Sequence, residues 1–175
     1  MRRLILFRHA KSDWSLAATA DHDRGLATRG RKAAGPMGAW LAGRGFRPEL
    51  VLCSTAKRAK ATWDIAKGAF TPAPETRVVR EAYEASAEGL LELIRAAPSE
   101  AQTLMIVGHN PGLASLVDLL AGSGDPEARR LLSVKFPTAA IAVLDLPFDG
   151  WAQAAPRAGR LDRFVTPKSL GLDVA

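Results

Sequence analysis

The sequence lacks the features that stabilise secreted domains or anchor a chain in a membrane. Cys53 is the only cysteine among 175 residues, so the chain can form no internal disulfide and no cysteine-rich zinc site. No apolar run approaches the roughly 18 residues that cross a bilayer. The opening apolar run stops at Arg8 and His9, below the length of a signal peptide's hydrophobic region. We therefore expect a cytoplasmic protein that binds no membrane.

Aromatic residues are also scarce, at 6% of the chain, whereas proteins that bind single-stranded nucleic acid combine cations with stacking aromatic rings. Positive charge is uneven: the first 60 residues hold 13 of the 24 Lys and Arg but only 4 of the 18 Asp and Glu. A basic first third on a slightly acidic remainder predicts a local anion site and no nucleic-acid partner.

The size and composition predict one globular domain. Hydrophobic residues make up 47% of the chain and charged residues 24%, which is ordinary globular usage. A chain of this length buries enough surface to fold without disulfides or metals. We expect a monomer with one domain over residues 1–175 and a loosely held tail from about residue 167.

Short apolar runs alternate with longer amphipathic stretches, which is typical of an α/β domain with a mostly parallel sheet. Helices are expected over residues 28–44, 55–69, 87–97 and 111–121. Gly35-Pro36 predicts a kink or break in the first of them. Asn110 suits the N-cap of the last, and Pro111 its first position. Gly122-Ser123-Gly124 after this helix predicts a loop. The expected strands are Leu4–Phe7, Leu50–Cys53, Val78–Val79, Leu104–Val107, Ala139–Leu144 and a weaker one at Arg163–Val165.

Three of these strands are followed directly by residues of types that often act in catalysis or bind anions. The first runs into Arg8 and His9, the second into the helix of Arg58, and the fourth into His109 and Asn110. Because the carboxyl ends of parallel strands share one edge of a sheet, two histidines and two arginines should meet there. Either histidine alone is more often a structural residue. Their joint occurrence with the arginines favours a functional site.

This set of residues suits a phosphoryl group. A neutral imidazole is a competent nucleophile toward phosphorus, and the planar guanidinium fork suits phosphoryl oxygens. His109 precedes a helix start, which also favours an anion. The arrangement requires no metal or cofactor. Asp21, His22 and Asp23 cannot easily converge on one ion from adjacent positions, so we expect an exposed loop there.

Four segments, taken together and in this order, resemble the histidine phosphatase superfamily, and more closely its small SixA-type phosphohistidine phosphatase branch. The resemblance covers roughly residues 3–145 and implies a three-layer, phosphoglycerate mutase-like fold with helices on both faces of the sheet. The segments are Arg8-His9-Ala10-Lys11-Ser12, Arg24-Gly25-Leu26-Ala27-Thr28-Arg29-Gly30, Cys53-Ser54 with Arg58-Ala59 and Thr62, and Val107-Gly108-His109-Asn110-Pro111.

The resemblance implies a role for each residue. His9 is the phosphorylated nucleophile, Arg8 and Arg58 hold the phosphoryl oxygens, and His109 stabilises the transferring group. We place three further substrate-binding residues beside them, namely Lys11, Ser12 and Asn110. Related phosphatases use a carboxylate after the third strand as the proton donor. Glu81 occupies a similar place, Glu84 competes with it, and a surface role is equally open for both.

We accordingly expect a metal-independent phosphatase that acts through a phosphohistidine intermediate. The chain has little material beyond the sheet and its helices, and no capping segment, which favours phosphohistidine of a protein partner as the substrate. A phosphomonoesterase acting on a small phosphorylated metabolite is the alternative among enzymes. A non-catalytic phosphate-binding module is the alternative from another class.

Overall fold

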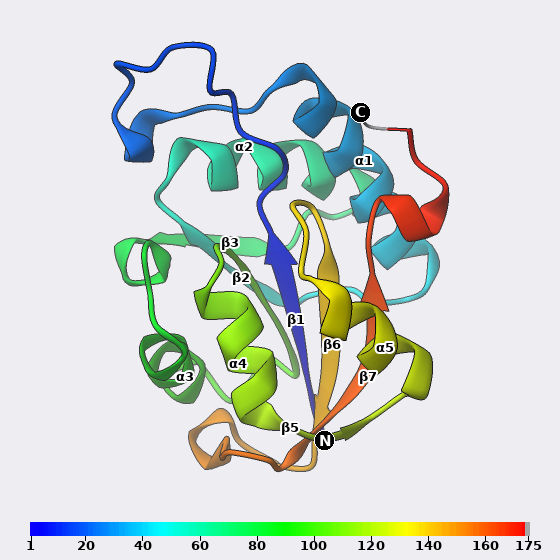
Figure 1. Cartoon of the computed structure of the whole chain (residues 1–175). Coiled ribbons are helices and arrows are strands. Elements are labelled where there is room, and N and C mark those ends of the chain that lie inside the picture. Colours follow the sequence, from blue (N-terminus) through cyan, green and yellow to red (C-terminus); the bar gives the residue numbers. More distant parts are fainter. Residues whose placement is uncertain (174–175) are drawn as a thin grey trace.

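A computed structural model describes residues 1–173 (Figure 1). Its centre is a seven-stranded sheet in the order β3-β2-β4-β1-β6-β7-β5. The strands are β1 (Arg2–Arg8), β2 (Leu50–Ser54), β3 (Glu75–Val79), β4 (Thr103–Gly108), β5 (Ala121–Gly124), β6 (Ile141–Leu146) and β7 (Gly159–Val165). The helices are α1 (Thr28–Gly43), α2 (Lys57–Ala66), α3 (Ala87–Arg95), α4 (Gly112–Leu120) and α5 (Pro126–Val134).

The sheet is mostly parallel, as the sequence predicts. β1 pairs in parallel with β4, β4 with β2, and β2 with β3. The edge strand β5 pairs in parallel with β7. Only β6 runs the other way, and it lies antiparallel to both β1 and β7. The residues before β6 therefore reach the same edge of the sheet as the residues after β1.

The hydrophobic residues of β1 alternate between the two faces of the sheet. Leu4 and Leu6 belong to a core packed by α3, α4 and α5, whereas Ile5 and Phe7 belong to a core packed by α1 and α2. All four side chains are fully buried. A strand with both faces covered reads as a continuous apolar run, and this explains why the sequence locates β1 so clearly. The predicted three-layer α/β fold is confirmed (Figure 1).

The expected break at Gly35-Pro36 does not occur, because α1 runs without interruption across Pro36. Proline inside a helix costs about 3 kcal/mol through a lost hydrogen bond and a steric clash. The buried face of α1 offsets this cost: Met37 and Leu41 are fully buried. Gly38 lets α1 approach α2 so closely that a Cβ there would lie 2.4 Å from the Ala66 carbonyl oxygen.

Two further local expectations differ from the structure. Gly122-Ser123-Gly124 was expected to be a loop, yet it forms most of β5. The glycine is needed for a close approach, since a Cβ at Gly122 would lie 1.9 Å from the Arg157 carbonyl oxygen. α4 begins at Gly112, one residue later than expected. The Asn110 carboxamide oxygen still accepts the Ala114 N–H at 3.2 Å.

The chain after Pro167 packs against the domain as far as it is described. Lys168–Leu170 forms a short 3-10 helix, and Leu170 and Leu172 contact the core on the α1 side of the sheet. The loose tail expected there also includes residues 174–175, which lie outside the described residues. No helix within residues 1–173 is long and apolar enough to cross a membrane.

The contact between α1 and α2 generates a stability prediction. Gly38→Ala should lower the free energy of unfolding by about 1–3 kcal/mol, because the new methyl group meets the Ala66 backbone. Gly35→Ala is the matched control in the same helix, since its Cβ would meet only Ile65 Cγ2 at 3.8 Å. The control should be neutral or slightly stabilising. Urea denaturation measures both, and equal effects would contradict the close packing at Gly38.

Candidate active site

The register between β1 and β4 brings the two histidines together. Arg8 lies opposite Gly108, and the His9 N–H donates to the Gly108 carbonyl at 3.0 Å. The imidazole rings of His9 and His109, which follow these strands directly, have centroids 5.1 Å apart. From the antiparallel side, the N–H of Ala139 donates to the His9 carbonyl at 3.0 Å. The predicted meeting of strand ends is therefore observed.

His9 is buried, and its ring orientation is fixed. Nδ1 lies 2.7 Å from the carbonyl oxygen of Ala10. Because a carbonyl only accepts hydrogen bonds, Nδ1 carries the proton and Nε2 keeps its lone pair. Burial, followed by the positive charges of the neighbouring groups, lowers the pKa of His9 to about 3. The imidazole is therefore neutral at physiological pH.

His109 is held beside it by the end of β2. Its Nε2 lies 2.7 Å from Ser54 Oγ, and Ser54 Oγ in turn accepts the Ala56 N–H at 3.2 Å. Burial and the charge of Arg58 lower the pKa of His109 to about 4. Its Nδ1 is buried without a hydrogen-bond partner among the described residues. A buried polar nitrogen without a partner is costly, and a ligand oxygen would satisfy it.

Both predicted arginines reach this site. Arg8 donates from one terminal nitrogen to the Phe136 carbonyl at 2.9 Å, while its Nε is buried without a partner in the described part of the chain. Arg58, in the first turn of α2, is 9% exposed. Burial and the charge of Arg58 lower the pKa of Arg8. The positive charges of Arg8 and Arg58 repel each other, and an anion bound near both would relieve this repulsion.

One hydroxyl group joins the His9 segment to the Arg58 helix. Thr62 Oγ1 accepts the Ala10 N–H at 2.9 Å and donates to the Arg58 carbonyl at 2.7 Å. Thr62 is fully buried one turn after Arg58. These two bonds give Thr62 an orienting role, because they hold the His9 segment and the Arg58 backbone together.

The segment Asp21–Asp23 was expected to be an exposed loop, and Asp21 and Asp23 are exposed. The segment is a short 3-10 helix whose first residue contacts the site. Arg58 donates to the Asp21 carbonyl at 2.7 Å and to its carboxylate at 3.1 Å. The hydroxyl of Tyr83 donates to the same carboxylate oxygen. Neither Asp21 nor Tyr83 was predicted: Asp21 lies 13 residues after β1, and Tyr83, although it follows β3 closely, reaches the site through its contact with Asp21.

These contacts determine the protonation states of Asp21 and Tyr83. The hydrogen bond from Tyr83 and then the charge of Arg58 lower the pKa of Asp21, so its carboxylate is ionised. Burial and the Asp21 hydrogen bond raise the pKa of Tyr83 to about 12. The Tyr83 ring also packs edge-on against His109, with centroids 5.6 Å apart. At neutral pH neither Asp21 nor Tyr83 releases a proton.

The remaining predicted residues differ in their contacts, and Glu81 makes none with the histidines or arginines. Asn110 has both ends of its carboxamide engaged, since it also donates to the Phe136 carbonyl at 2.8 Å. Ser12 Oγ accepts the indole N–H of Trp14 at 2.9 Å. Lys11 lines a cavity beside the His9 segment. Glu81 is exposed in a short 3-10 helix after β3, and no hydrogen bond joins its carboxylate to another described residue.

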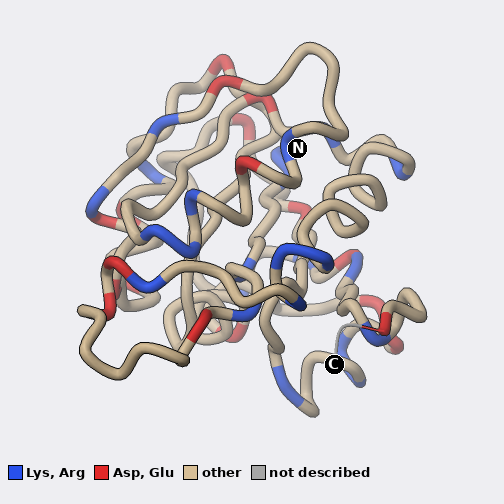
Figure 2. Tube along the Cα trace, turned by 90° about the horizontal axis from the view of Figure 1, so that it is seen from above, with Lys and Arg blue, Asp and Glu red and all other residues tan. Residues whose placement is uncertain are grey.

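The charged groups elsewhere indicate no competing centre. Within residues 1–173 no group of three His, Cys, Asp or Glu side chains is arranged to hold a metal ion. Over much of the trace Lys and Arg lie among Asp and Glu, whereas residues 24–48 contain six arginines and lysines and no acidic residue (Figure 2). Cys53 is buried, and burial raises the pKa of its thiol to about 12, so the thiol is a small apolar group and not a nucleophile.

Comparison with known proteins decides the family. Residues 4–90 match the model of the histidine phosphatase superfamily, branch 1. The uncharacterized protein Rv1276c of Mycobacterium tuberculosis is 39% identical over 163 residues, which cover 92% of this chain and 99% of the relative. The chain belongs to the histidine phosphatase superfamily.

Solved structures place it in the SixA-type group of that superfamily. A chain from Agrobacterium tumefaciens assigned as the phosphohistidine phosphatase SixA superposes with a TM-score of 0.80 at 34% identity, covering 95% of this chain and 98% of that one. A SixA assignment from Nakamurella multipartitia gives a TM-score of 0.78 at 30% identity, with 95% and 96% coverage. The protein is a phosphatase of this type, as the sequence motifs predict.

The buried neutral state of His9 generates a pH prediction. Below pH 6.5 the unfolded chain binds a proton at His9 that the folded chain excludes until about pH 3, so stability falls as the pH falls through this window. Between pH 7 and pH 5 the free energy of unfolding of the wild type should fall by about 2 kcal/mol more than that of His9→Asn. Urea denaturation at both pH values measures this difference. Parallel pH dependences would contradict the burial of a neutral His9.

Proposed function

We propose that this SixA-type phosphatase removes the phosphoryl group from phosphohistidine of a protein partner through a phosphoenzyme at His9. The observation that carries the proposal is the bond from His9 Nδ1–H to the Ala10 carbonyl at 2.7 Å. This bond fixes the tautomer whose Nε2 lone pair is free to attack phosphorus. The two superfamily members from Agrobacterium and Nakamurella, which carry the name phosphohistidine phosphatase, support the same substrate class.

The reaction proceeds in two displacements. His9 Nε2 forms a bond to phosphorus while the bond between phosphorus and the substrate's imidazole nitrogen breaks, and the leaving imidazole keeps the bonding pair and takes a proton. Water then attacks phosphorus, the bond to Nε2 breaks, and inorganic phosphate leaves. Each step transfers the same group, so one set of charges around it serves both.

The positive groups around His9 stabilise the transferring phosphoryl. Arg58 donates two hydrogen bonds to Asp21. A guanidinium has five N–H donors, so three remain for phosphoryl oxygens. Arg8 Nε and His109 Nδ1 are two of the three buried side-chain nitrogens without partners in the described chain, the third being Arg24 Nε, and the first two suit an oxygen of the same group. A phosphoryl group held in this way satisfies donors that otherwise remain unpaired.

The state of the nearby acids favours phosphohistidine over an alkyl phosphate. Asp21, the carboxylate in contact with Arg58, is ionised, and Tyr83 keeps its proton. An alkoxide leaving group needs a proton donor, whereas an imidazole is protonated readily on its own. Glu81 remains the candidate acid for a phosphomonoester, with Glu84 as its competitor. A small phosphorylated metabolite is therefore the alternative substrate.

The nucleophile is tested by following the phosphoenzyme. His9→Ala should lower kcat/KM by roughly a thousandfold or more and abolish covalent phosphorylation. His109→Asn is the control, because it removes a stabilising group and keeps the nucleophile: it should slow turnover and still carry phosphate on His9. The enzyme is exposed briefly to phosphoramidate and digested without acid treatment, and mass spectrometry of the peptides then locates the phosphate. Phosphate on His109, or full activity of His9→Ala, would refute the assignment.

The leaving group is tested with two substrates. A phosphohistidine peptide should have a kcat/KM at least a hundredfold above that of an alkyl phosphate, because a missing general acid costs about 10²–10⁴ in rate. Glu81→Gln should lower the alkyl phosphate reaction more than the peptide reaction. Glu100→Gln is the matched control for the loss of one negative charge, because Glu100 is exposed and lies just before β4, at the edge of the sheet opposite the histidines. Similar kcat/KM values for both substrates, with equal losses in Glu81→Gln, would favour the small phosphomonoester.

A further inference from the structure

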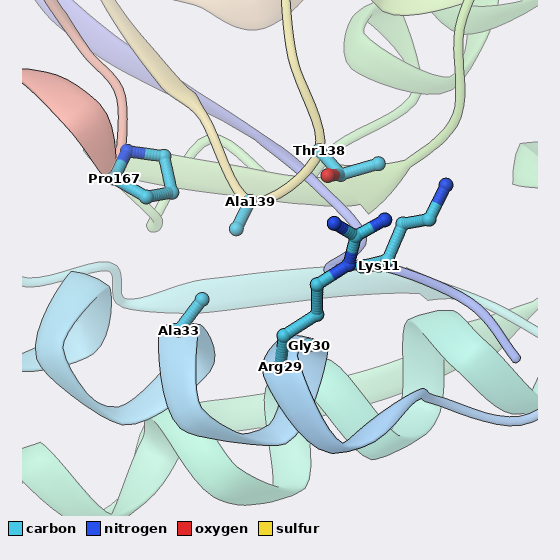
Figure 3. Close-up of a pocket in the computed structure, with 7 residues that line it drawn as sticks. All are labelled: Lys11, Arg29, Gly30, Ala33, Thr138, Ala139 and Pro167. Carbon is cyan, nitrogen blue, oxygen red and sulfur yellow. The ribbon is translucent and has the colours of Figure 1, made fainter. Parts of the chain in front are cut away.

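A second cavity lies beside the His9 segment, with a volume of about 210 Å³ (Figure 3). We call it the Lys11 pocket. It is formed between the start of α1, the residues before β6 and Pro167, which lies two residues after β7. Its lining residues are Lys11, Arg29, Gly30, Ala33, Thr138, Ala139 and Pro167.

The polar groups of the Lys11 pocket are donors. The side chains of Lys11 and Arg29 extend to the same side of the opening, and Thr138 lies across from them (Figure 3). No Asp or Glu belongs to the lining, and neither cation forms an ion pair with any residue of the described chain. The pocket therefore offers two uncompensated positive charges to a ligand.

Exposed arginines of this protein fall into two groups. Arg77 pairs with Glu75, Arg95 with Glu92 and Arg130 with Glu127, at 2.8, 2.9 and 2.6 Å. Arg29, like Arg31 and Arg44, has no carboxylate partner within residues 1–173, and it differs from those two because it lines a cavity together with Lys11. Two such cations around one cavity constitute an anion site.

The backbone holds the Lys11 pocket in a fixed place relative to the nucleophile. Lys11 follows His9 by two residues, so their Cα atoms lie within about 7 Å of each other. The Lys11 carbonyl accepts the Ala27 N–H at 2.9 Å just before α1. Gly30 packs so tightly that a Cβ there would lie 2.2 Å from the same carbonyl oxygen. The opposite wall is fixed too, because Ala139 donates to the His9 carbonyl.

We propose that the Lys11 pocket binds a second anionic group, a carboxylate or a phosphate, of the same molecule whose phosphoryl group reacts at His9. The inference rests on the proposed function, since it takes the phosphoryl site as the first anchor. Two anchors at a fixed spacing select substrates that carry a second oxyanion at a set distance from phosphorus. Arg29 is a specificity-determining residue in this arrangement, and it takes no part in the displacement itself.

Binding of unreactive phosphonates tests the pocket without requiring turnover. The probes are ω-carboxyalkyl phosphonates of increasing chain length, each compared with the alkyl phosphonate of equal length. Inhibition of phosphoramidate hydrolysis gives Ki, and calorimetry gives Kd. At one chain length the carboxylate should improve binding roughly tenfold over the plain alkyl group, and the gain should fall at shorter and longer chains.

Two variants in α1 distinguish binding at the Lys11 pocket from a general effect of net charge. Arg29→Gln should remove most of the tenfold gain. Arg31→Gln changes the net charge equally, and Arg31 is exposed on the same helix outside the pocket lining, so it should keep the gain. Equal losses in both variants, or a gain that is independent of chain length, would overturn the proposal. Circular dichroism confirms that both variants fold.

The source of the second oxyanion is decided by a parallel series of α,ω-bisphosphonates. Stronger binding of the carboxylates indicates an acidic side chain near the phosphohistidine, and stronger binding of the bisphosphonates indicates a second phosphoryl group. If the enzyme hydrolyses phosphoramidate but binds neither series more tightly than the plain alkyl phosphonates, the Lys11 pocket proposal fails and the proposed function stands. If phosphoramidate is not hydrolysed and methylphosphonate does not bind, the proposed function fails as well.

Discussion

The pairing of β1 with β4 is the constraint on which the site depends. It sets Arg8 opposite Gly108, so that the next residue of each strand is a histidine. A shift of one residue would turn Leu4 and Leu6 toward the core that now holds Ile5 and Phe7. The two apolar faces of β1 therefore fix the register, and the register fixes the histidines. The catalytic geometry is a consequence of core packing.

The electrostatics of the site follow from burial. Two arginines and two histidines lie together, and charging all four groups would be prohibitive in a low-dielectric environment. Burial keeps both imidazoles neutral, with pKa values of about 3 and 4. Asp21 balances Arg58 through its carboxylate, and the Phe136 carbonyl accepts from Arg8. The remaining positive charge is available to the phosphoryl group, whose negative charge is distributed over several oxygens.

The sequence predicts the parts of this structure that local patterns encode. β1 and β4 are buried on both faces and are continuous apolar runs, so the strand ends and their histidines were found from the sequence. Asp21 and Tyr83 were not, because Asp21 contacts Arg58 across 37 residues of the chain and Tyr83 contacts Asp21 across 62. The uninterrupted helix at Pro36 was also missed, since tertiary packing outweighs a local penalty. Likewise Gly122, expected in a loop, serves a close approach of two backbones.

Three consecutive residues connect the nucleophile to the rest of the molecule. His9 donates its N–H to β4, Ala10 donates to Thr62 on α2, and the Lys11 carbonyl accepts from the residue before α1. Each peptide group is thus tied to a different element, and the segment can move only if several elements move with it. The distance between the phosphoryl site and the Lys11 pocket is for this reason set by the framework of the fold. Selection by spacing between two anions requires this rigidity, since a flexible link between the anchors would accept ligands of many lengths.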